Sequence, residues 1–451
     1  MASPLLAQTG KAEADPILLR PAPGEAALLG TGRAKVPVWA YNGSVPGPVL
    51  RVRRGEELRV RLQNGLTEPT TVHWHGLRVP NAMDGVAGLT QAAVPAGSAF
   101  DYAFTPPDAG TFWYHPHHRT AEQMARGLYG MLIVEEAEAP VVDRDLPLVI
   151  ADWRLDRDGH LHEESLGSMG DGSHAGRVGN VLTVNGGVPG TATVKSGERI
   201  RLRLLNASNA RVLVLDVRGL EARVVALDGQ PVRPFSLGED GIVLGPAQRA
   251  DVIADVALAP GGAADIVEVS GNLDFPVLRL NTHATEVARG NPLDAPVALP
   301  GNGLPDPDLR APLDVTLRME GGAMGRLTAA VHNGVSKDMR TLVNDGMVWA
   351  FNGVAGMADK PLFSVPRGRT VRLTMENETG WPHAMHVHGH HFRTLSGGLP
   401  NDDQAWRDTV LMGRGGKTTV AFVADNPGKW VLHCHMLEHQ ATGMVTWFEV
   451  T

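Results

Sequence analysis

Residues 55–64, Gly-Glu-Glu-Leu-Arg-Val-Arg-Leu-Gln-Asn, return twice along the chain in recognisable form. The second copy, residues 197–206, is Gly-Glu-Arg-Ile-Arg-Leu-Arg-Leu-Leu-Asn, and the third, residues 368–377, is Gly-Arg-Thr-Val-Arg-Leu-Thr-Met-Glu-Asn. An Asn-Gly pair, which is typical of a tight turn, precedes each copy. Within each copy apolar and polar side chains alternate, which predicts a strand with one buried face.

A repeated turn and strand at long intervals predicts three domains of similar plan. The copies begin at Gly55, Gly197 and Gly368, and the 53 Gly and 32 Pro are spread over all 451 residues. Many short strands joined by turns are typical of β-sandwiches. We therefore predict an all-β protein with domains at residues 1–138, 139–309 and 310–451. The alternative is a chance likeness among turn–strand units.

Bulk composition excludes several classes of function. The net charge is −8 and no basic stripe is present, so the chain is not expected to bind nucleic acid. It lacks a run of eighteen apolar residues, so no membrane span is expected. Residues 1–8 lack the pattern of a signal peptide, which is consistent with a leader already removed. The single cysteine, Cys434, excludes an intrachain disulfide.

Four separate His-x-His pairs lie in the outer domains, two in each. The pairs are His73/His75, His115/His117, His386/His388 and His433/His435. On a strand, residues two apart project from the same face. One such pair is an ordinary surface or core feature, but eight converging imidazoles are costly to bury without partners, and a metal cluster satisfies them. The middle domain has no histidine near the corresponding place, around residues 260–269, and is expected to be a spacer.

The last pair encloses the single cysteine. Its two imidazoles point one way along the strand, so the thiolate must point the other way, toward a second site. His383 lies at an odd offset from the pair that follows it and therefore faces this second site. A thiolate, two imidazoles and a weak axial thioether are the ligands of a blue-copper centre. The predicted mononuclear site consists of His383, Cys434, His439 and Met444.

With these motifs the chain resembles the multicopper oxidases, which include laccases and bacterial copper-efflux oxidases. Four segments carry the resemblance: His-Trp-His-Gly at 73–76, Trp-Tyr-His-Pro-His at 113–117, His-Ala-Met-His-Val-His-Gly at 383–389, and His-Cys-His-Met-Leu-Glu-His-Gln-Ala-Thr-Gly-Met at 433–444. The resemblance covers essentially the whole chain. It implies three cupredoxin-like Greek-key β-sandwich domains.

The resemblance also implies four copper ions and a role for each ligand. The type 2 ion would be held by His73 and His386, and the mononuclear site would hold the type 1 ion. The type 3 pair would take His75, His115, His117, His388, His433 and His435. Asp84 matches an acidic residue beside the type 2 ion, where it would steer protons and act in catalysis; alternatively it is a turn residue before Gly85.

Two positions depart from the family pattern. Ala384 follows the first histidine of the third motif, where the family usually has proline, and Pro382 precedes it instead. Gln440 replaces a glutamate of the copper-efflux branch, and an amide cannot relay protons. No ligand is lost by either change.

The expected activity is that of a laccase-like oxidase. It would couple four one-electron oxidations of phenols or aromatic amines, with Cys434 as the electron link, to the reduction of dioxygen to water. The alternative is a cuprous or ferrous ion oxidase in envelope copper tolerance. Five methionines support that alternative only weakly because they are sparse, and methionine often fills cores: Met319, Met324, Met339, Met347 and Met357.

Two other functions are disfavoured. A copper-free cupredoxin scaffold protein would not retain every ligand, and a copper nitrite reductase lacks the four-pair arrangement. The resemblance implies a periplasmic or otherwise exported protein, and we expect a monomer.

Overall fold

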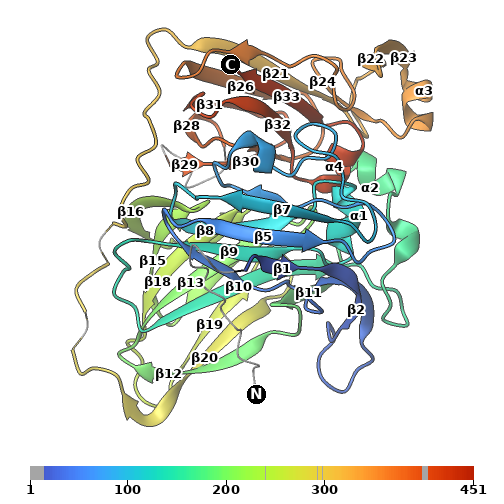
Figure 1. The fold of residues 1–451 in the computed structure, drawn as a ribbon. Helices are drawn as coiled ribbons and strands as arrows, with labels where there is room; N and C mark the ends of the chain where they lie inside the picture. Colours follow the sequence, from blue (N-terminus) through green and yellow to red (C-terminus); the bar gives the residue numbers. More distant parts are fainter. Residues whose placement is uncertain (1–14, 239, 292, 297, 399–404) are drawn as a thin grey trace.

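A computed structural model describes residues 15–238, 240–291, 293–296, 298–398 and 405–451. Residues 1–8, where a leader would have been attached, lie outside this part of the chain. The described chain consists mainly of β-strands arranged in three successive groups (Figure 1). No helix within these ranges has the length and apolar character needed to cross a lipid bilayer.

The first group forms a three-stranded sheet, β1-β5-β7, a four-stranded sheet, β4-β9-β8-β6, and the hairpin β2-β3. Its elements are β1 (Ile17–Leu19), β2 (Pro21–Ala26), β3 (Val36–Tyr41), β4 (Leu50–Arg53), β5 (Leu58–Gln63), β6 (His73–His75), η1 (Asn81–Met83), β7 (Ala99–Phe104), β8 (Gly110–His115), α1 (Thr120–Ala125) and β9 (Gly130–Glu135). The two sheets enclose an apolar core that includes Val60, Trp74 and Phe112.

The middle group forms a six-stranded sheet, β11-β10-β13-β18-β15-β16, and a five-stranded sheet, β12-β20-β19-β14-β17. Its elements are β10 (Arg144–Trp153), η2 (Glu163–Ser165), α2 (Met169–Ser173), β11 (Val181–Val184), β12 (Gly190–Ser196), β13 (Arg199–Asn206), β14 (Leu213–Arg218), β15 (Glu221–Leu227), β16 (Gln230–Ser236), β17 (Ile242–Leu244), β18 (Arg249–Asp255), β19 (Ala263–Glu268) and β20 (Phe275–Val287). Leu202, Leu215 and Val252 lie in the core between these sheets.

The third group repeats this plan with sheets β24-β21-β26-β31-β28-β29 and β25-β33-β32-β27-β30. Its elements are β21 (Leu313–Gly321), β22 (Ala329–His332), β23 (Val335–Asp338), α3 (Met339–Asn344), β24 (Trp349–Phe351), β25 (Ser364–Val365), β26 (Thr370–Asn377), β27 (His383–Val387), β28 (Phe392–Ser396), β29 (Trp406–Arg407), β30 (Thr409–Met412), β31 (Lys417–Val423), β32 (Gly428–Cys434), α4 (Leu437–Ala441) and β33 (Val445–Val450). Its core includes Leu373, Phe422 and Cys434.

The three repeated segments form the strands β5, β13 and β26. β5 alternates between buried and exposed residues, as predicted, and β26 alternates between buried and half-buried residues over most of its length. β13 is buried along its whole length, which contradicts the expected exposed face. Its arginines pair with acidic groups and reach the first group: Arg203 donates hydrogen bonds to Asp145 at 2.7 Å and to Thr111 at 2.9 Å.

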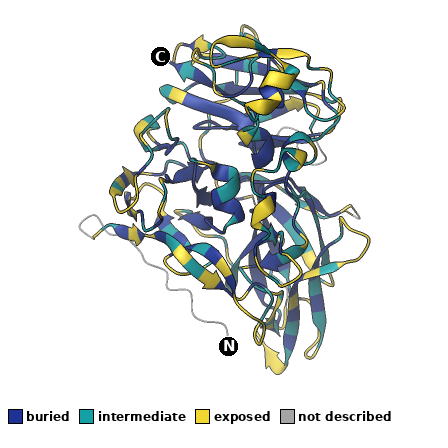
Figure 2. Cartoon of the chain, turned by 90° about the vertical axis from the view of Figure 1, so that its right-hand side faces the viewer, coloured by how far each residue is buried: buried dark blue, intermediate teal, exposed yellow. Residues whose placement is uncertain are grey.

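The two outer groups are neighbours: in Figure 1 the third group lies at the top of the molecule and the first group lies beneath it. Most exposed residues lie on loops and outer edges, and the strands inside are largely buried (Figure 2). The short helices α1 and α2 both contact α4. Residues that are distant in sequence therefore meet at the junction of the three groups.

Candidate metal centres

The four histidine pairs lie on two matching pairs of neighbouring strands. β6 runs antiparallel to β8 and places His73 opposite His115. β27 runs antiparallel to β32 and places His386 opposite His433. The second histidine of the other three pairs lies just beyond its strand, whereas β6 carries both of its own. Each outer group thus presents four imidazoles from two neighbouring strands of one sheet and the residues that follow them.

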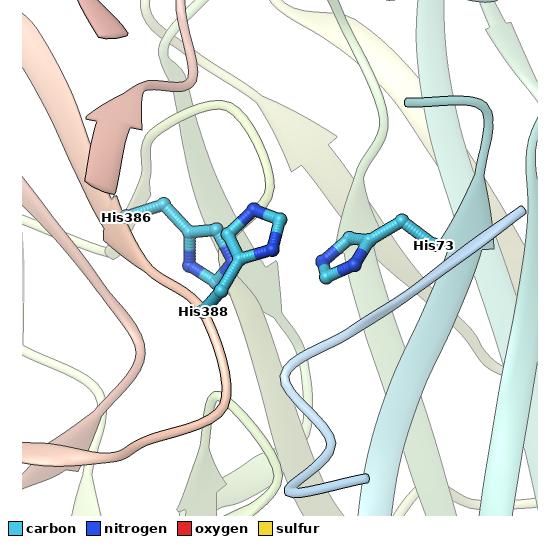
Figure 3. A group of neighbouring side chains, drawn as sticks. All are labelled: His73, His386 and His388. Atoms are coloured by element: carbon cyan, nitrogen blue, oxygen red, sulfur yellow. The ribbon is translucent and has the colours of Figure 1, made fainter. Parts of the chain in front are cut away.

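The two sets of imidazoles meet across the junction of the outer groups. Figure 3 shows His73 facing His386 and His388 from the opposite side. His73 stacks on His388 with ring centroids 3.9 Å apart, and His75 stacks on His386 at 3.8 Å. All of these side chains are buried. The eight histidines of the four pairs, which span residues 73 to 435, therefore lie in one enclosed cluster.

The ring nitrogens fall into groups of the size that surrounds one metal ion. His73, His386 and His388 form one group, with ligand nitrogens within 4.8 Å of one another, and His117, His388 and His433 form a second. In a third, the Nε2 atom of His115 lies 3.5 Å from both His75 Nδ1 and His435 Nε2. Three imidazoles per ion are typical of copper and zinc sites.

Imidazole nitrogens that lack a hydrogen-bond partner indicate whether the cluster suits a metal ion. Within the described chain, the buried Nε2 atoms of His73, His117 and His386 and the Nδ1 atom of His435 have no hydrogen-bond partner. Buried polar atoms in folded proteins are normally satisfied. His73, His117 and His386 each belong to a group of three neighbouring donor residues, so this donor set fits metal ions.

Burial also keeps the imidazoles in the neutral form that binds metal. Loss of solvent, followed by the charges of neighbouring imidazoles, lowers the pKa of most of the cluster histidines: His75, His115, His117, His386, His388, His433 and His435. For His75 and His386, contacts with Asp408 oppose this shift but do not reverse it. A neutral imidazole offers a lone pair to a cation.

Asp84 fixes the rings on one side of the cluster. Its main-chain oxygen is 2.8 Å from His73 Nδ1, and its carboxylate is 3.0 Å from His388 Nδ1. A hydrogen bond to one ring nitrogen turns the other toward the metal. Asp84 also precedes a turn at Gly85, whose φ is +78° and where a Cβ atom would lie 1.8 Å from the Val72 oxygen. Asp84 therefore contacts two histidines of the cluster and also precedes a turn.

Asp408, which the sequence did not single out, plays the same part on the other side. Its main-chain oxygen is 2.8 Å from His386 Nδ1, and its Oδ1 atom is 3.2 Å from His75 Nε2. Arg249, on β18 of the middle group, donates to both carboxylate oxygens at 3.0 and 2.6 Å. Burial would raise the pKa of Asp408, but Arg249 and then His75 outweigh it and hold that pKa well below its usual range.

The second site lies inside the third group. The Sγ atom of Cys434 is 3.6 Å from the Nδ1 atoms of both His383 and His439, which are themselves 3.0 Å apart. The opposite nitrogens are occupied: His383 Nε2 is 2.8 Å from the Thr379 hydroxyl, and His439 Nε2 is 2.7 Å from the His174 carbonyl. Both rings thus direct Nδ1 toward the sulfur.

Burial raises the pKa of the Cys434 thiol to about 12, so a thiolate here requires a nearby cation. Met444 is buried in the same core cluster, and its main-chain oxygen accepts a hydrogen bond from Cys434 at 3.1 Å. The Ala384 carbonyl accepts a hydrogen bond from His435 at 2.6 Å. The Gln440 Oε1 atom is buried and unpaired among the residues described.

Comparison with known proteins identifies the family. Models described as multicopper oxidase match residues 25–139, 144–261 and 330–451. The multicopper oxidase MmcO of Mycobacterium tuberculosis is 30% identical, over 93% of this chain and 84% of its own. Laccase-1 of Botryotinia fuckeliana is 28% identical over 91% of this chain and 78% of its own.

Solved structures of multicopper oxidases are also similar to this chain. A multi-copper oxidase from Pseudomonas thermotolerans has a TM-score of 0.83 and 33% identity, covering 99% of this chain and all of its own. Lac15, from a marine microbial metagenome, has a TM-score of 0.76 and 38% identity, covering 97% of this chain and all of its own. The predicted family and all-β fold of three cupredoxin-like domains are confirmed. The chain belongs to the multicopper oxidases, copper-dependent oxidoreductases that pass electrons from a reducing substrate to dioxygen.

Proposed function

We propose that this oxidase takes electrons singly from phenolic or aromatic amine donors and uses four of them to reduce one dioxygen to two waters. The observation that carries the proposal is the position of Cys434. It lies on β32 between His433 and His435 of the cluster, and its sulfur faces His383 and His439. One strand therefore links a one-electron site to a polynuclear site.

The proposed ligands follow the nitrogen groups. His73 and His386 would hold the type 2 ion, and the type 3 pair would be held by His75, His115 and His435 on one ion and by His117, His388 and His433 on the other. The type 1 ion would be held by His383, Cys434, His439 and Met444. Four bound copper ions would supply the one-electron redox chemistry that the reaction needs.

The protein's own groups would orient ligands and handle protons. Asp84 holds His388 and His73 in position and is the carboxylate placed to pass protons to the cluster. Asp408 holds His75 and His386, with Arg249 fixing its carboxylate. Gln440 cannot carry protons, so Asp84 is the proposed proton-handling residue.

The donor class is proposed from the methionines and from relatives. Met319 is fully buried in the core and cannot gather metal ions, whereas Met324 and Met357 are 74% and 41% exposed. Two scattered exposed thioethers are far fewer than a metal-gathering surface requires. Laccase-1 of Botryotinia fuckeliana supports a phenolic donor. The iron transport multicopper oxidase fetC of Epichloe festucae and a copper resistance protein A homologue of Pseudomonas syringae favour metal-ion oxidation as the second candidate.

The remaining proposals concern organisation and place. We place domain boundaries near Glu138 and Leu309, which lie between β9 and β10 and between β20 and β21. An exported, monomeric enzyme is proposed.

The test is to load the protein with copper, count the bound ions and record its visible spectrum. Oxygen uptake is then measured with 2,6-dimethoxyphenol and with Cu(I) side by side. We expect four coppers per chain, an intense blue band, and one dioxygen consumed per four phenols. Turnover with Cu(I) but not with phenol would establish the second candidate instead, and a colourless, inactive loaded protein would reject both.

A further inference from the structure

A segment of the middle group crosses the junction and lies over the helix that carries His439. We call residues 168–178, which include α2, the strap; α2 contacts α4 directly (Figure 1). Asp171 of the strap forms two hydrogen bonds with Arg154, at 2.6 and 3.0 Å. The Ser168 side chain accepts a hydrogen bond from the first turn of α2. The strap is therefore rooted in its own domain.

Consecutive strap residues are bonded to the third group. The hydrogen bonds run from Trp349 Nε1 to Gly172 O at 2.5 Å, from Ala323 N to Ser173 O at 2.7 Å, from His439 Nε2 to His174 O at 2.7 Å, and from Arg177 N to Glu438 Oε2 at 2.9 Å. Buried hydrogen bonds of this kind are costly to break without replacement. The strap is thus held by hydrogen bonds to its own domain and by hydrogen bonds to the third group.

The strap packs closely against its neighbours at two glycines. A Cβ atom at Gly172 would lie 2.8 Å from the Thr442 side chain. At Gly176, where φ is +82°, a Cβ atom would lie 2.4 Å from Ala210 Cβ. Only glycine permits this approach, so the backbone of the strap rests directly on its neighbours.

The strap separates the mononuclear site from solvent. Cys434, His383 and His439 are 0% exposed. The one N–H of His439 that points away from the sulfur is already donated to the His174 carbonyl. A donor molecule can therefore neither touch the His439 ring nor accept its proton while the strap is in place.

The outer side of the strap offers aromatic groups to solvent. His174 is exposed, and its ring meets the half-buried Trp381 edge to face, with centroids 5.3 Å apart. Its Nδ1 atom contacts Ser173 and Gly170, which leaves Nε2 facing outward. The exposed Met324 lies beside Gly380, next to Trp381. Flat aromatic molecules bind well to such a surface.

We propose that the electron donor docks on His174 and Trp381 rather than on His439, and that electrons enter through the His174 main chain. The inference rests on the proposed function and names a small aromatic donor, such as a phenol. In each event the phenol loses one electron and releases its hydroxyl proton to solvent, giving a phenoxyl radical. The one-electron acceptor would be the copper ion that His383, Cys434, His439 and Met444 would hold.

The first test replaces the docking surface and leaves the main chain in place. In the copper-loaded enzyme, His174→Ala should raise KM for 2,6-dimethoxyphenol roughly 2- to 10-fold. It should leave the blue band unchanged, because the copper ligands and the main chain at residue 174 are retained. His160→Ala, an exposed histidine of the same domain, is the matched control. An unchanged KM in a blue, phenol-oxidising His174→Ala enzyme overturns the docking site and leaves the proposed function intact.

The second test uses the copper-free protein and needs no activity. Diethyl pyrocarbonate labelling, followed by mass spectrometry, should modify His439 at least about tenfold more slowly than His160. An excess of 4-nitrophenol should slow labelling of His174 but not of His160. Gly176→Val, which pushes the strap away from Ala210, should make His439 reactive. Equal labelling rates of His439 and His160 in the unchanged protein would contradict the claim that the strap shields His439 from solvent.

Discussion

The two proposed copper sites differ in what surrounds their imidazoles. The cluster is bordered by two buried carboxylates, Asp84 and Asp408, and the latter is held by Arg249. The two imidazoles of the mononuclear site are instead hydrogen-bonded to neutral oxygens, those of the Thr379 hydroxyl and the His174 carbonyl. The difference follows the charge of the ligands, because eight neutral imidazoles need outside anions to balance several cations, whereas the Cys434 thiolate is itself an anion.

The difference also separates two roles of the middle domain. At the cluster it contributes a charged group, Arg249, that fixes a carboxylate between two histidines. At the mononuclear site its contact with a proposed ligand is a main-chain one, from the His174 carbonyl of the strap to His439. Copper affinity at the cluster should therefore depend on buried charge, and donor access at the mononuclear site on packing.

The largest effect is expected from Cys434→Ser. A serine hydroxyl is not a thiolate, so the blue band and turnover with every donor should disappear, a larger loss than the ~10–100-fold that follows removal of an outer partner. The cluster ligands are untouched, so three coppers should still bind. Copper analysis and the visible spectrum check this, and a blue, active variant would reject the electron path through residue 434.

A smaller effect is expected from Arg249→Met, which leaves Asp408 buried without its cation. Copper affinity at the cluster should fall about 10–100-fold, with an altered type 2 electron paramagnetic resonance signal and an unchanged blue band. Arg249→Lys should restore part of the affinity because it keeps the charge. The exposed Arg279→Met is the control, since its partner Asp265 lies on the surface. Loss of the blue band in Arg249→Met would contradict separate surroundings for the two sites.

The smallest effect is expected in the pH dependence of the free energy of unfolding. In the copper-free protein the pKa of His117 is lowered by burial, so this ring takes up a proton only on unfolding. The free energy of unfolding should therefore fall as the pH drops below about 6.5, by up to ~1.4 kcal/mol per pH unit for each such histidine. His117→Gln should reduce the slope of the unfolding free energy against pH by the contribution of one proton. The control His160→Gln, at an exposed position, should leave this slope unchanged. Urea titrations at pH 5 to 8 measure both slopes.

Local periodicity predicted the strands and the histidine pairs, because a strand's two faces are set by neighbouring residues. It failed at β13, whose arginines are buried against partners such as Asp145 and Thr111 that lie elsewhere in the chain. Asp408 and Arg249 were missed for the same reason. Their contacts join residues 159 and 333 positions apart, and no spacing rule records such a contact.

The pairing of His388 with Asp84 joins residues 304 positions apart, and this separation sets an order of events during synthesis. The first domain's four cluster histidines are complete when a quarter of the chain has been made, yet their partners emerge only in its last seventy residues. A chain that stops short of residue 435 cannot close the cluster. Closure of the cluster thus requires synthesis to proceed through His435, and a shorter chain cannot assemble the site that is proposed to reduce dioxygen.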